Sequence, residues 1–257
     1  MEVYNAMAKV KLDRSIKIDN QLSILTLFRI IKSFIFNPIH SFRVERKEWE
    51  KFFARRKLEK LGFGVYLDSK KIRNDTIGPD WADLLNIYSL VRIRKPEIVV
   101  ELGSGFSTVA FSKALYDNYL QFGIKGKLYS FDGDKNWLSY TKKYFPEELS
   151  DYCEFRLGEE EEHSMYGEKV RAWANRNGLA PQFLYIDGLN KISDSLIGAE
   201  ALFLEAVAPG DFFILVDGRG PTCRFLEKHL KLQYKIIKNS VHYWSSFERV
   251  SRNTFSE

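Results

Sequence analysis

The segment EIVVELGSGFST places a carboxylate at the end of a short β-branched run, directly before a glycine-rich turn. Glu101 closes the run, and Gly103 and Gly105 follow it. Glycine lets the backbone approach a ligand closely and adopt positive φ angles. A carboxylate at the end of a buried strand is costly unless a polar group meets it. The spacing therefore predicts a polar partner for Glu101. The two glycines alone fit either a ligand-binding turn or an ordinary turn between a strand and a helix.

Three further acids end apolar runs in the same way. They are Asp132 in YSFDGD, Asp187 in LYIDG and Asp217 in FILVDG. In an open α/β sheet, ligands bind beyond the carboxyl ends of the strands, near the point where the strand order reverses.

From about residue 80 onward, short apolar runs alternate with helical patterns, which predicts a parallel sheet covered on both faces. We expect a doubly wound, Rossmann-like α/β domain over residues 80–257, preceded by a basic helical extension over residues 1–79. The expected strands are 97–102, 127–132, 153–157, 182–187, 211–217, 234–239 and 243–250. The expected helices are 42–60, 81–94, 107–122, 136–145, 167–178, 195–207 and 223–231, with a further amphipathic helix over 23–36.

Composition excludes several classes of protein. The chain has two cysteines without CxxC spacing and four scattered histidines, which argues against a disulfide framework or a zinc site of Cys and His. The N-terminus lacks the apolar region of a secretory signal, and the longest apolar stretch, 24–36, is too short to span a bilayer. We therefore expect a cytoplasmic protein.

The glycine turn distinguishes between cofactor classes. The dinucleotide fingerprint G-x-G-x-x-G requires a third glycine where this chain has Thr108, and the G-K-[ST] of a phosphate-binding loop is absent. VVELGSGFST instead resembles the first motif of the class I S-adenosylmethionine-dependent methyltransferases, an acid followed by L-G-x-G. Ser107 stands at the third position of that glycine pattern.

The resemblance continues, in order, over residues 96–220. It implies that Glu101 meets the ammonium end of S-adenosylmethionine and that Asp132, with Asp134 as the alternative, binds the ribose hydroxyls, since a carboxylate can accept two hydrogen bonds. It also implies adenine contacts at Gly158 and Glu159 and a cofactor contact at Asp187. The full set of expected cofactor-binding residues is Glu101, Gly103, Ser104, Gly105, Ser107, Thr108, Asp132, Gly158, Glu159 and Asp187.

YIDG and FILVDGRGPTCRFL are similar to the branch of this superfamily that methylates sugars and small hydroxylated metabolites. Some members hold Mg²⁺ with acids at the positions of Asp187 and Asp217, although here Gly218 replaces the acid or amide that usually stands beside the second ligand. The resemblance thus implies an O-methyltransferase (EC 2.1.1 class) acting on a sugar, surface glycan or related small molecule. The rival functions are an NAD(P)-linked oxidoreductase and a non-catalytic cofactor-binding scaffold.

Methyl transfer to oxygen requires alignment of the reactants and removal of a proton from the acceptor. The candidate bases are Asp187 and His163. His163 stands beside four glutamates, which favour its cationic form and make it the weaker candidate. Arg219 and His242 are further residues that could face the site.

Charge is unevenly distributed along the chain. Residues 1–73 hold 17 Lys+Arg against 8 Asp+Glu, a net of +9, and the remainder holds 22 against 26, a net of −4. Residues 23–60 are therefore expected to contact an anionic surface such as the inner face of a membrane, or alternatively to pack on the core or on a second copy in a homo-oligomer. Acids interleaved with this basic run argue against nucleic acid, which is not an expected partner.

Overall fold

The computed structural model describes residues 38–65, 80–173, 178–188, 197–239 and 242–250. The chain divides into two compact units, residues 1–49 and 50–257. The described part of the first unit is the beginning of helix α3 (Pro38–Lys60), and all contacts below lie within the second unit. The amphipathic helix predicted over 23–36 lies outside the described residues.

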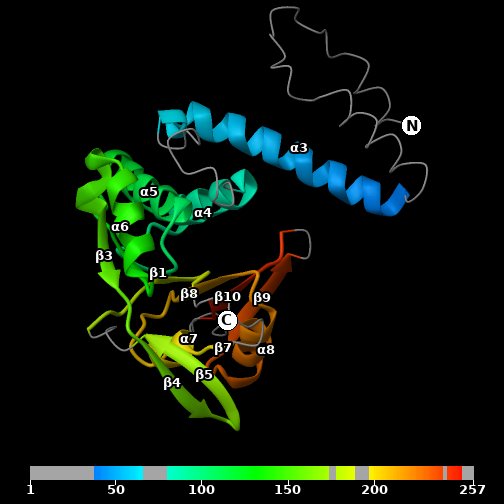
Figure 1. The fold of residues 1–257 in the computed structure, drawn as a ribbon, viewed down its shortest axis with the longest axis vertical. Coiled ribbons are helices and arrows are strands. Elements are labelled where there is room, and N and C mark those ends of the chain that lie inside the picture. Colours follow the sequence, from blue (N-terminus) through cyan, green and yellow to red (C-terminus); the bar gives the residue numbers. More distant parts are fainter. Residues whose placement is uncertain (1–37, 66–79, 174–177, 189–196, 240–241, 251–257) are drawn as a thin grey trace, which may run out of the picture. The chain divides into compact units, whose positions relative to one another are not determined.

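A seven-stranded sheet with the order β3-β2-β1-β6-β8-β10-β9 organises the second unit (Figure 1). Five neighbouring strands run parallel, and β10 runs antiparallel to both of its neighbours. The strand order reverses between β1 and β6, the position at which open α/β sheets bind ligands. The predicted doubly wound, mostly parallel fold is confirmed. The strands are β1 (Ile98–Leu102), β2 (Lys127–Asp132), β3 (Cys153–Leu157), β6 (Phe183–Ile186), β8 (Phe213–Asp217), β9 (Tyr234–Asn239) and β10 (Trp244–Arg249).

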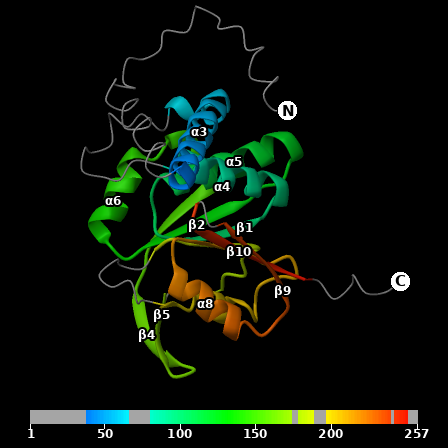
Figure 2. The ribbon, with the colours of Figure 1, turned by 90° about the vertical axis from the view of Figure 1, so that its right-hand side faces the viewer.

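Helices cover both faces of this sheet (Figure 2). Successive strand residues point to opposite faces, so Val99 packs in a core with α4 (Trp81–Arg94) and α5 (Phe106–Phe122), whereas Val100 packs in a second core with α7 (Glu200–Leu204) and α8 (Gly220–His229). Helix α6 (Lys135–Tyr144) follows β2, and the short 3₁₀ helices η1 (Phe63–Val65) and η2 (Glu147–Tyr152) complete the helical elements.

Sequence signals account for the helix ends. The Asp80 side chain accepts a hydrogen bond from the Ala82 N–H and caps α4. The same helix ends at Lys95, which is left-handed (φ 52°) and precedes a proline. Asp134 caps α6, and Gly123 (φ 71°) ends α5. These caps leave the strand-to-helix turns in defined positions at the carboxyl edge of the sheet.

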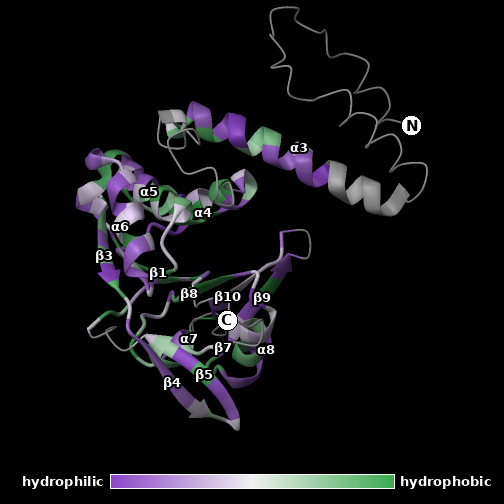
Figure 3. Ribbon diagram, viewed as in Figure 1, coloured by the Kyte–Doolittle hydropathy of each residue, from purple (hydrophilic) through white to green (hydrophobic). Residues whose placement is uncertain are grey.

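The helix predicted over 167–178 is wrong. Residues 168–173 form strand β5 (Glu168–Trp173), which pairs with β4 (Glu160–Met165) and β7 (Ile197–Gly198) in a second, three-stranded sheet. Tyr166 and Gly167 connect β4 to β5 with φ angles of 53° and 81°, the positive values of a tight hairpin turn. Val170 and Ala172 point inward, whereas β4 is hydrophilic along its length (Figure 3). Burial of alternate residues outweighed the helical propensity of this Lys-, Arg- and Ala-containing stretch.

The helix predicted over 195–207 is also largely wrong. Ile197–Gly198 forms β7, and helix α7 covers only Glu200–Leu204. The Gly198 N–H donates to Thr222 Oγ1, and the buried Glu200 carboxylate accepts from the Trp173 N–H. These two hydrogen bonds hold the segment to α8 and to the hairpin in a short, extended connection.

The end of α3 belongs to the α/β core. Leu58 and Phe63 are fully buried and pack with Tyr88 and other core residues, and the Phe63 and Tyr88 rings meet edge to face. The predicted division at residues 79 and 80 stays a prediction, but residues 58–63 pack on the same core as α4.

Replacement of Leu58 by alanine tests this packing. Because the side chain is fully buried, Leu58→Ala should lower the free energy of unfolding by about 2–5 kcal/mol in urea denaturation. The control is Ile93→Ala on α4, whose side chain is 76% exposed and whose loss should change stability by less than about 0.5 kcal/mol. Equal, small effects of the two substitutions would contradict the packing of α3 on the core.

Candidate functional site

Three hydroxyl groups surround the carboxylate of Glu101, which is completely buried at the end of β1. Ser107 donates to Oε1 at 2.5 Å, and Thr108 and Ser130 donate to Oε2 at 2.7 and 2.6 Å. Two of these hydroxyls come from the first turn of α5 and the third from β2, whose Ser130 pairs with Glu101 in the sheet. The protein itself therefore supplies three of the polar partners that the sequence predicts for Glu101.

Burial raises the pKa of Glu101 to about 7, while the hydrogen bonds from Ser107, Ser130 and Thr108 act in the opposite direction. Desolvation disfavours the charged carboxylate and the hydroxyl donors favour it. The nearby Asp187 adds a smaller repulsion that also raises the pKa. A cationic group close to Glu101 would favour its charged form.

The glycine turn is held by a close backbone approach. Gly103 has φ +100°, and its N–H donates to the carbonyl of Phe131 at 2.8 Å. A methyl group on Gly103 would lie 2.7 Å from the backbone nitrogen of Gly188, in the loop after β6. The Gly188 N–H in turn donates to the Leu102 carbonyl. Glycine is required at both positions because the loops after β1 and β6 meet backbone to backbone at the point of strand reversal.

The other two amides of the turn also have acceptors within the protein. The Ser104 N–H donates to Asp132 Oδ2 at 2.9 Å, and the Ser104 hydroxyl donates to the same atom at 3.0 Å. The Gly105 N–H donates to Thr108 Oγ1 at 2.9 Å. All three turn amides, from Gly103 to Gly105, are thus hydrogen-bonded internally.

The structure separates the two candidates for the ribose contact. Asp132 is partly buried, burial raises its pKa, and it touches the glycine turn through Ser104. Asp134 is exposed and caps α6, accepting from the N–H groups of Asn136 and Trp137. Asp132 therefore lies against the turn, whereas Asp134 has a structural role in starting a helix.

Trp173 is a site neighbour that the sequence analysis did not identify. A methyl group on Gly158 would overlap the Trp173 ring at 1.9 Å, and one on Gly133 would lie 3.2 Å from it. The buried Trp173 thus packs over the ends of β2 and β3, where the adenine contact of Gly158 and Glu159 was predicted, while Glu159 is exposed. It was missed because residues 167–178 were assigned to a helix. The two-residue Tyr-Gly connection before β5 is the signal that could have revealed it.

Asp187 follows β6, and Asp217 is the last residue of the neighbouring strand β8. The Tyr185 hydroxyl donates to Asp217 Oδ2 at 3.1 Å, and Arg219 donates to the backbone carbonyl of Asp187 with its guanidinium 3.7 Å from Oδ1. Burial and the charges of Asp187, Asp217 and Glu101 raise the pKa of Tyr185 far above its usual range. These acids thus concentrate negative charge beside the glycine turn.

The predicted Mg²⁺ site at Asp187 and Asp217 stays a prediction. Among the described residues, a group of three or more metal-ligating side chains gathers elsewhere, at Asp80, Asp83 and His242. The structure does not bring His163 to the acids of the sheet edge: it lies on β4, with its ring 5.1 Å from that of Phe203 and Nε2 3.6 Å from Glu161. Asp187 is the candidate base that shares the edge with the glycine turn.

An apolar pocket adjoins the turn between the start of α5 and α6. Trp137 on its wall donates from Nε1 to the Ser104 carbonyl at 2.7 Å, which ties α6 to the turn. A ligand that reaches the turn from this side meets aromatic surface rather than charge. The pocket is lined by Gly105, Phe106, Val109, Trp137, Tyr140, Thr141, Tyr144 and Phe145.

The predicted membrane contact of residues 23–60 falls partly outside the described residues and stays a prediction, as does a homo-oligomer. Trp49, Phe52 and Phe53 on α3 are 59%, 46% and 62% exposed. Within the part of the chain that the structure describes, no helix combines the length and the apolar character needed to cross a membrane.

Fold and site together define a Rossmann-like α/β domain with a glycine turn and carboxylates at its point of strand reversal. No family model matches the chain, and no curated protein matches it. Solved structures that are similar include a methyltransferase from Geobacter sulfurreducens (13% identity, 74% of this chain and 90% of that chain, TM-score 0.46). An O-methyltransferase from Bacillus cereus in complex with SAH is also similar (14% identity, 76% of this chain and 90% of that chain, TM-score 0.45). A third similar structure is an SAH-bound methyltransferase from Podospora anserina (14% identity, 81% of this chain and 88% of that chain, TM-score 0.47).

A pair of alanine substitutions tests the backbone contact at the turn. Gly103→Ala combines a positive φ with a methyl group 2.7 Å from Gly188 N, and it should lower the free energy of unfolding by about 2 kcal/mol or more. Gly105 has an extended φ of 169° and nothing within 4 Å of an added methyl group, so Gly105→Ala should change stability by less than about 0.5 kcal/mol. Chemical denaturation of both variants measures the difference. Equal losses would show that the turn is not fixed as described.

The raised pKa of Glu101 has a defined effect on stability. Between the ordinary carboxyl pKa of 4.5 and the folded value of about 7, the folded state keeps a proton that the unfolded state loses. Stability therefore falls as pH rises through this window, by on the order of 3 kcal/mol from this group. Urea denaturation from pH 4.5 to 8 measures the free energy of unfolding of the wild type and of Glu101→Gln. The wild-type value minus the variant value should fall as pH rises and level off above about pH 7. A difference that does not vary with pH would refute the assignment.

Proposed function

We propose that this protein is an S-adenosylmethionine-dependent methyltransferase that methylates a hydroxyl group of a sugar, a surface glycan or a related small molecule. The observation that carries the proposal is the internal hydrogen bonding of the glycine turn. The amides of Gly103, Ser104 and Gly105 donate to Phe131, Asp132 and Thr108. A ligand could therefore lie close to the backbone of the turn, but an anion would find these three N–H groups already hydrogen-bonded within the protein.

This arrangement disfavours a dinucleotide. In the dinucleotide-binding fold the pyrophosphate rests on backbone N–H groups at the turn and on the helix N-terminus. Here Asp132 already accepts a hydrogen bond from the Ser104 N–H, and Glu101 accepts one from Ser107, two residues after the turn. A negatively charged pyrophosphate would approach two carboxylates, whereas the sulfonium and ammonium groups of S-adenosylmethionine carry positive charge that these carboxylates attract. Electrostatics thus favours the methyl donor over NAD(P).

The residues assigned to the cofactor have complementary chemistry. Asp132 Oδ2 already accepts hydrogen bonds from the Ser104 N–H and hydroxyl, and Oδ1 accepts one from the Asp134 N–H. One acceptor position on Oδ1 would therefore serve a ribose hydroxyl. Glu101 would supply the negative charge under the ammonium end, through its hydroxyl partners or a bridging group. When bound, S-adenosylmethionine supplies an activated methyl group on a sulfonium centre. The remaining task of the chain is to orient an acceptor hydroxyl and remove its proton.

Asp187 is proposed for that task. It is partly exposed at the end of β6, one residue before the Gly188 that contacts the glycine turn, and its carboxylate lies 3.7 Å from Arg219. The carboxylate would hold the acceptor hydroxyl and take its proton, while Arg219 restrains the loop through the Asp187 carbonyl. Mg²⁺ between Asp187 and Asp217 would serve the same end by lowering the pKa of the hydroxyl. Acceptor screens are therefore run with and without Mg²⁺.

Calorimetric titration with S-adenosylmethionine and, separately, with NAD⁺ tests the proposal. Binding of the methyl donor should weaken at least tenfold in Asp132→Asn, because the ribose loses a charged acceptor. Asp134→Asn is the matched control: asparagine also caps helices well, so α6 should stay intact and binding should change little.

Heat with NAD⁺ but not with S-adenosylmethionine would overturn the proposal in favour of an oxidoreductase. A reversal of the two variants would assign the ribose to Asp134 instead. A protein that binds the methyl donor but transfers no methyl group to any hydroxylated acceptor, with its binding of a partner unchanged in Asp132→Asn, would support the scaffold function.

A further inference from the structure

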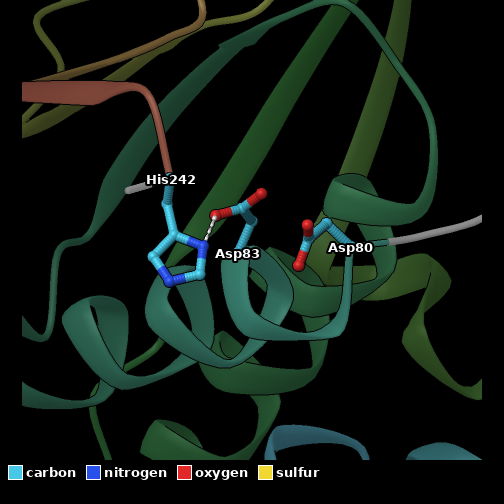
Figure 4. Close-up of side chains that lie close together, drawn as sticks. All are labelled: Asp80, Asp83 and His242. Carbon is cyan, nitrogen blue, oxygen red and sulfur yellow. Dashed lines mark ion pairs between the residues drawn. The ribbon is translucent and has the colours of Figure 1, made fainter. Parts of the chain in front are cut away.

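A second group of ligating side chains lies apart from the glycine turn. Asp80 precedes α4, Asp83 lies in its first turn, and His242 stands in the loop between β9 and β10 (Figure 4). One potential ligand atom from each residue lies within 4.8 Å of the others. Segments about 160 positions apart in the sequence thus bring one imidazole and two carboxylates together.

His242 has an unusual set of contacts. Its side chain is only 10% exposed, and Nε2 lies 2.6 Å from Glu50 Oε2 on α3. The other ring nitrogen, Nδ1, points toward Asp83 Oδ1 at 3.8 Å (Figure 4) and is buried without a hydrogen-bond partner among the described residues. A buried polar atom directed at a carboxylate beyond hydrogen-bond distance requires an explanation.

The contact with Glu50 determines what Nδ1 can do. A carboxylate oxygen 2.6 Å from Nε2 accepts a hydrogen bond from the N–H at that nitrogen, so the neutral imidazole presents a lone pair at Nδ1. A lone pair facing a carboxylate oxygen is repulsive unless a positive charge lies between them. A metal-bound histidine characteristically donates its second ring N–H to a carboxylate in this manner, which fixes the ring and strengthens the ligand.

We propose that Asp80, Asp83 and His242 bind a divalent metal ion, with Glu50 orienting the imidazole. A set of one nitrogen and two carboxylate ligands suits Zn²⁺, and three protein ligands leave a position for water. Ligand atoms on tetrahedral Zn²⁺ are about 3.4 Å apart, given bond lengths of about 2.1 Å. The observed spacing of up to 4.8 Å therefore requires side-chain movements of about an ångström.

The surroundings limit how the site can form. One Asp80 oxygen accepts the Ala82 N–H and the other lies 3.6 Å from the Lys51 ammonium. The ion would thus displace Lys51 from Asp80 without uncapping α4. The alternative to a metal ion is a hydrogen on Nδ1, which would make His242 an imidazolium ion paired with Glu50 and Asp83. The experiment separates these two states.

The site would secure the loop that leads into β10. His242 precedes Trp244, the first residue of β10, which pairs with Asp217 at the carboxyl edge of the sheet. The Gly218 N–H donates to the Tyr243 carbonyl at 2.9 Å in the same loop. A metal ion at His242 would therefore fix this loop to the start of α4, next to the strand end that carries Asp217.

Zinc binding to the full chain tests the proposal independently of methyl transfer. Protein stripped with EDTA is titrated with ZnCl₂ by calorimetry, bound metal is counted by elemental analysis after dialysis, and thermal unfolding is followed with and without Zn²⁺. We expect one equivalent bound, a rise in Tm with Zn²⁺, and at least tenfold weaker binding in His242→Gln and in Asp83→Asn. Binding should also weaken as pH falls, because protons compete for the ligands.

His163→Gln is the matched control, since His163 also lies near a glutamate, at 3.6 Å from Glu161, and should retain full zinc binding. Asp83→Asn keeps the size of the side chain and serves as the second variant if His242→Gln fails to fold. Absence of zinc binding by the wild type, or equal binding in all variants, would overturn the proposal and leave His242 as one partner of an ion pair.

Discussion

The candidate site depends on one buried carboxylate. Glu101 lies near the end of β1, without exposure to solvent, and is held by hydroxyls from Ser107, Thr108 and Ser130. Because a buried charge without partners is strongly destabilising, this set of donors fixes the first turn of α5 and β2 relative to β1. The shape of the glycine turn follows from this constraint, since Thr108 also accepts the Gly105 amide.

Similar turns can serve different ligands, and the difference lies in where their amides point. In this chain Asp132 takes the Ser104 amide and adds a second carboxylate beside Glu101, while Asp187 adds a third at the neighbouring strand. Such a concentration of negative charge in a partly buried edge attracts cations and repels phosphates. The hydrogen-bonding pattern of three consecutive amides is thus more informative about the ligand class than the presence of the two glycines.

The strands of the seven-stranded sheet and the helices α4, α5 and α6 could be predicted because their signals are local: β-branched runs, apolar periodicity and the glycines and prolines that bound them. The acid at each strand end was equally visible. Only the Tyr-Gly connection gave a local signal for the hairpin. The short α7 and the burial of Val170 and Trp173 could not be predicted, because they depend on partners from distant segments such as Gly158 and Glu200. The same holds for His242, whose contacts with Glu50 and Asp83 connect residues that share no sequence pattern.

The position of β10 determines when this protein can finish folding. Strand β10 enters the sheet between β8 and β9 rather than adding to an edge, and it connects to α4 through the ion pair of Glu248 with Arg94 at 2.6 Å. Domains form as the ribosome releases them, N-terminal parts first. Until residues 244–249 emerge, β8 has an unpaired edge and Trp244 cannot reach Asp217. The sheet is therefore completed only after residues 244–249 have been synthesised, and a nascent chain stalled before β10 would expose a hydrophobic strand edge to chaperones or to aggregation.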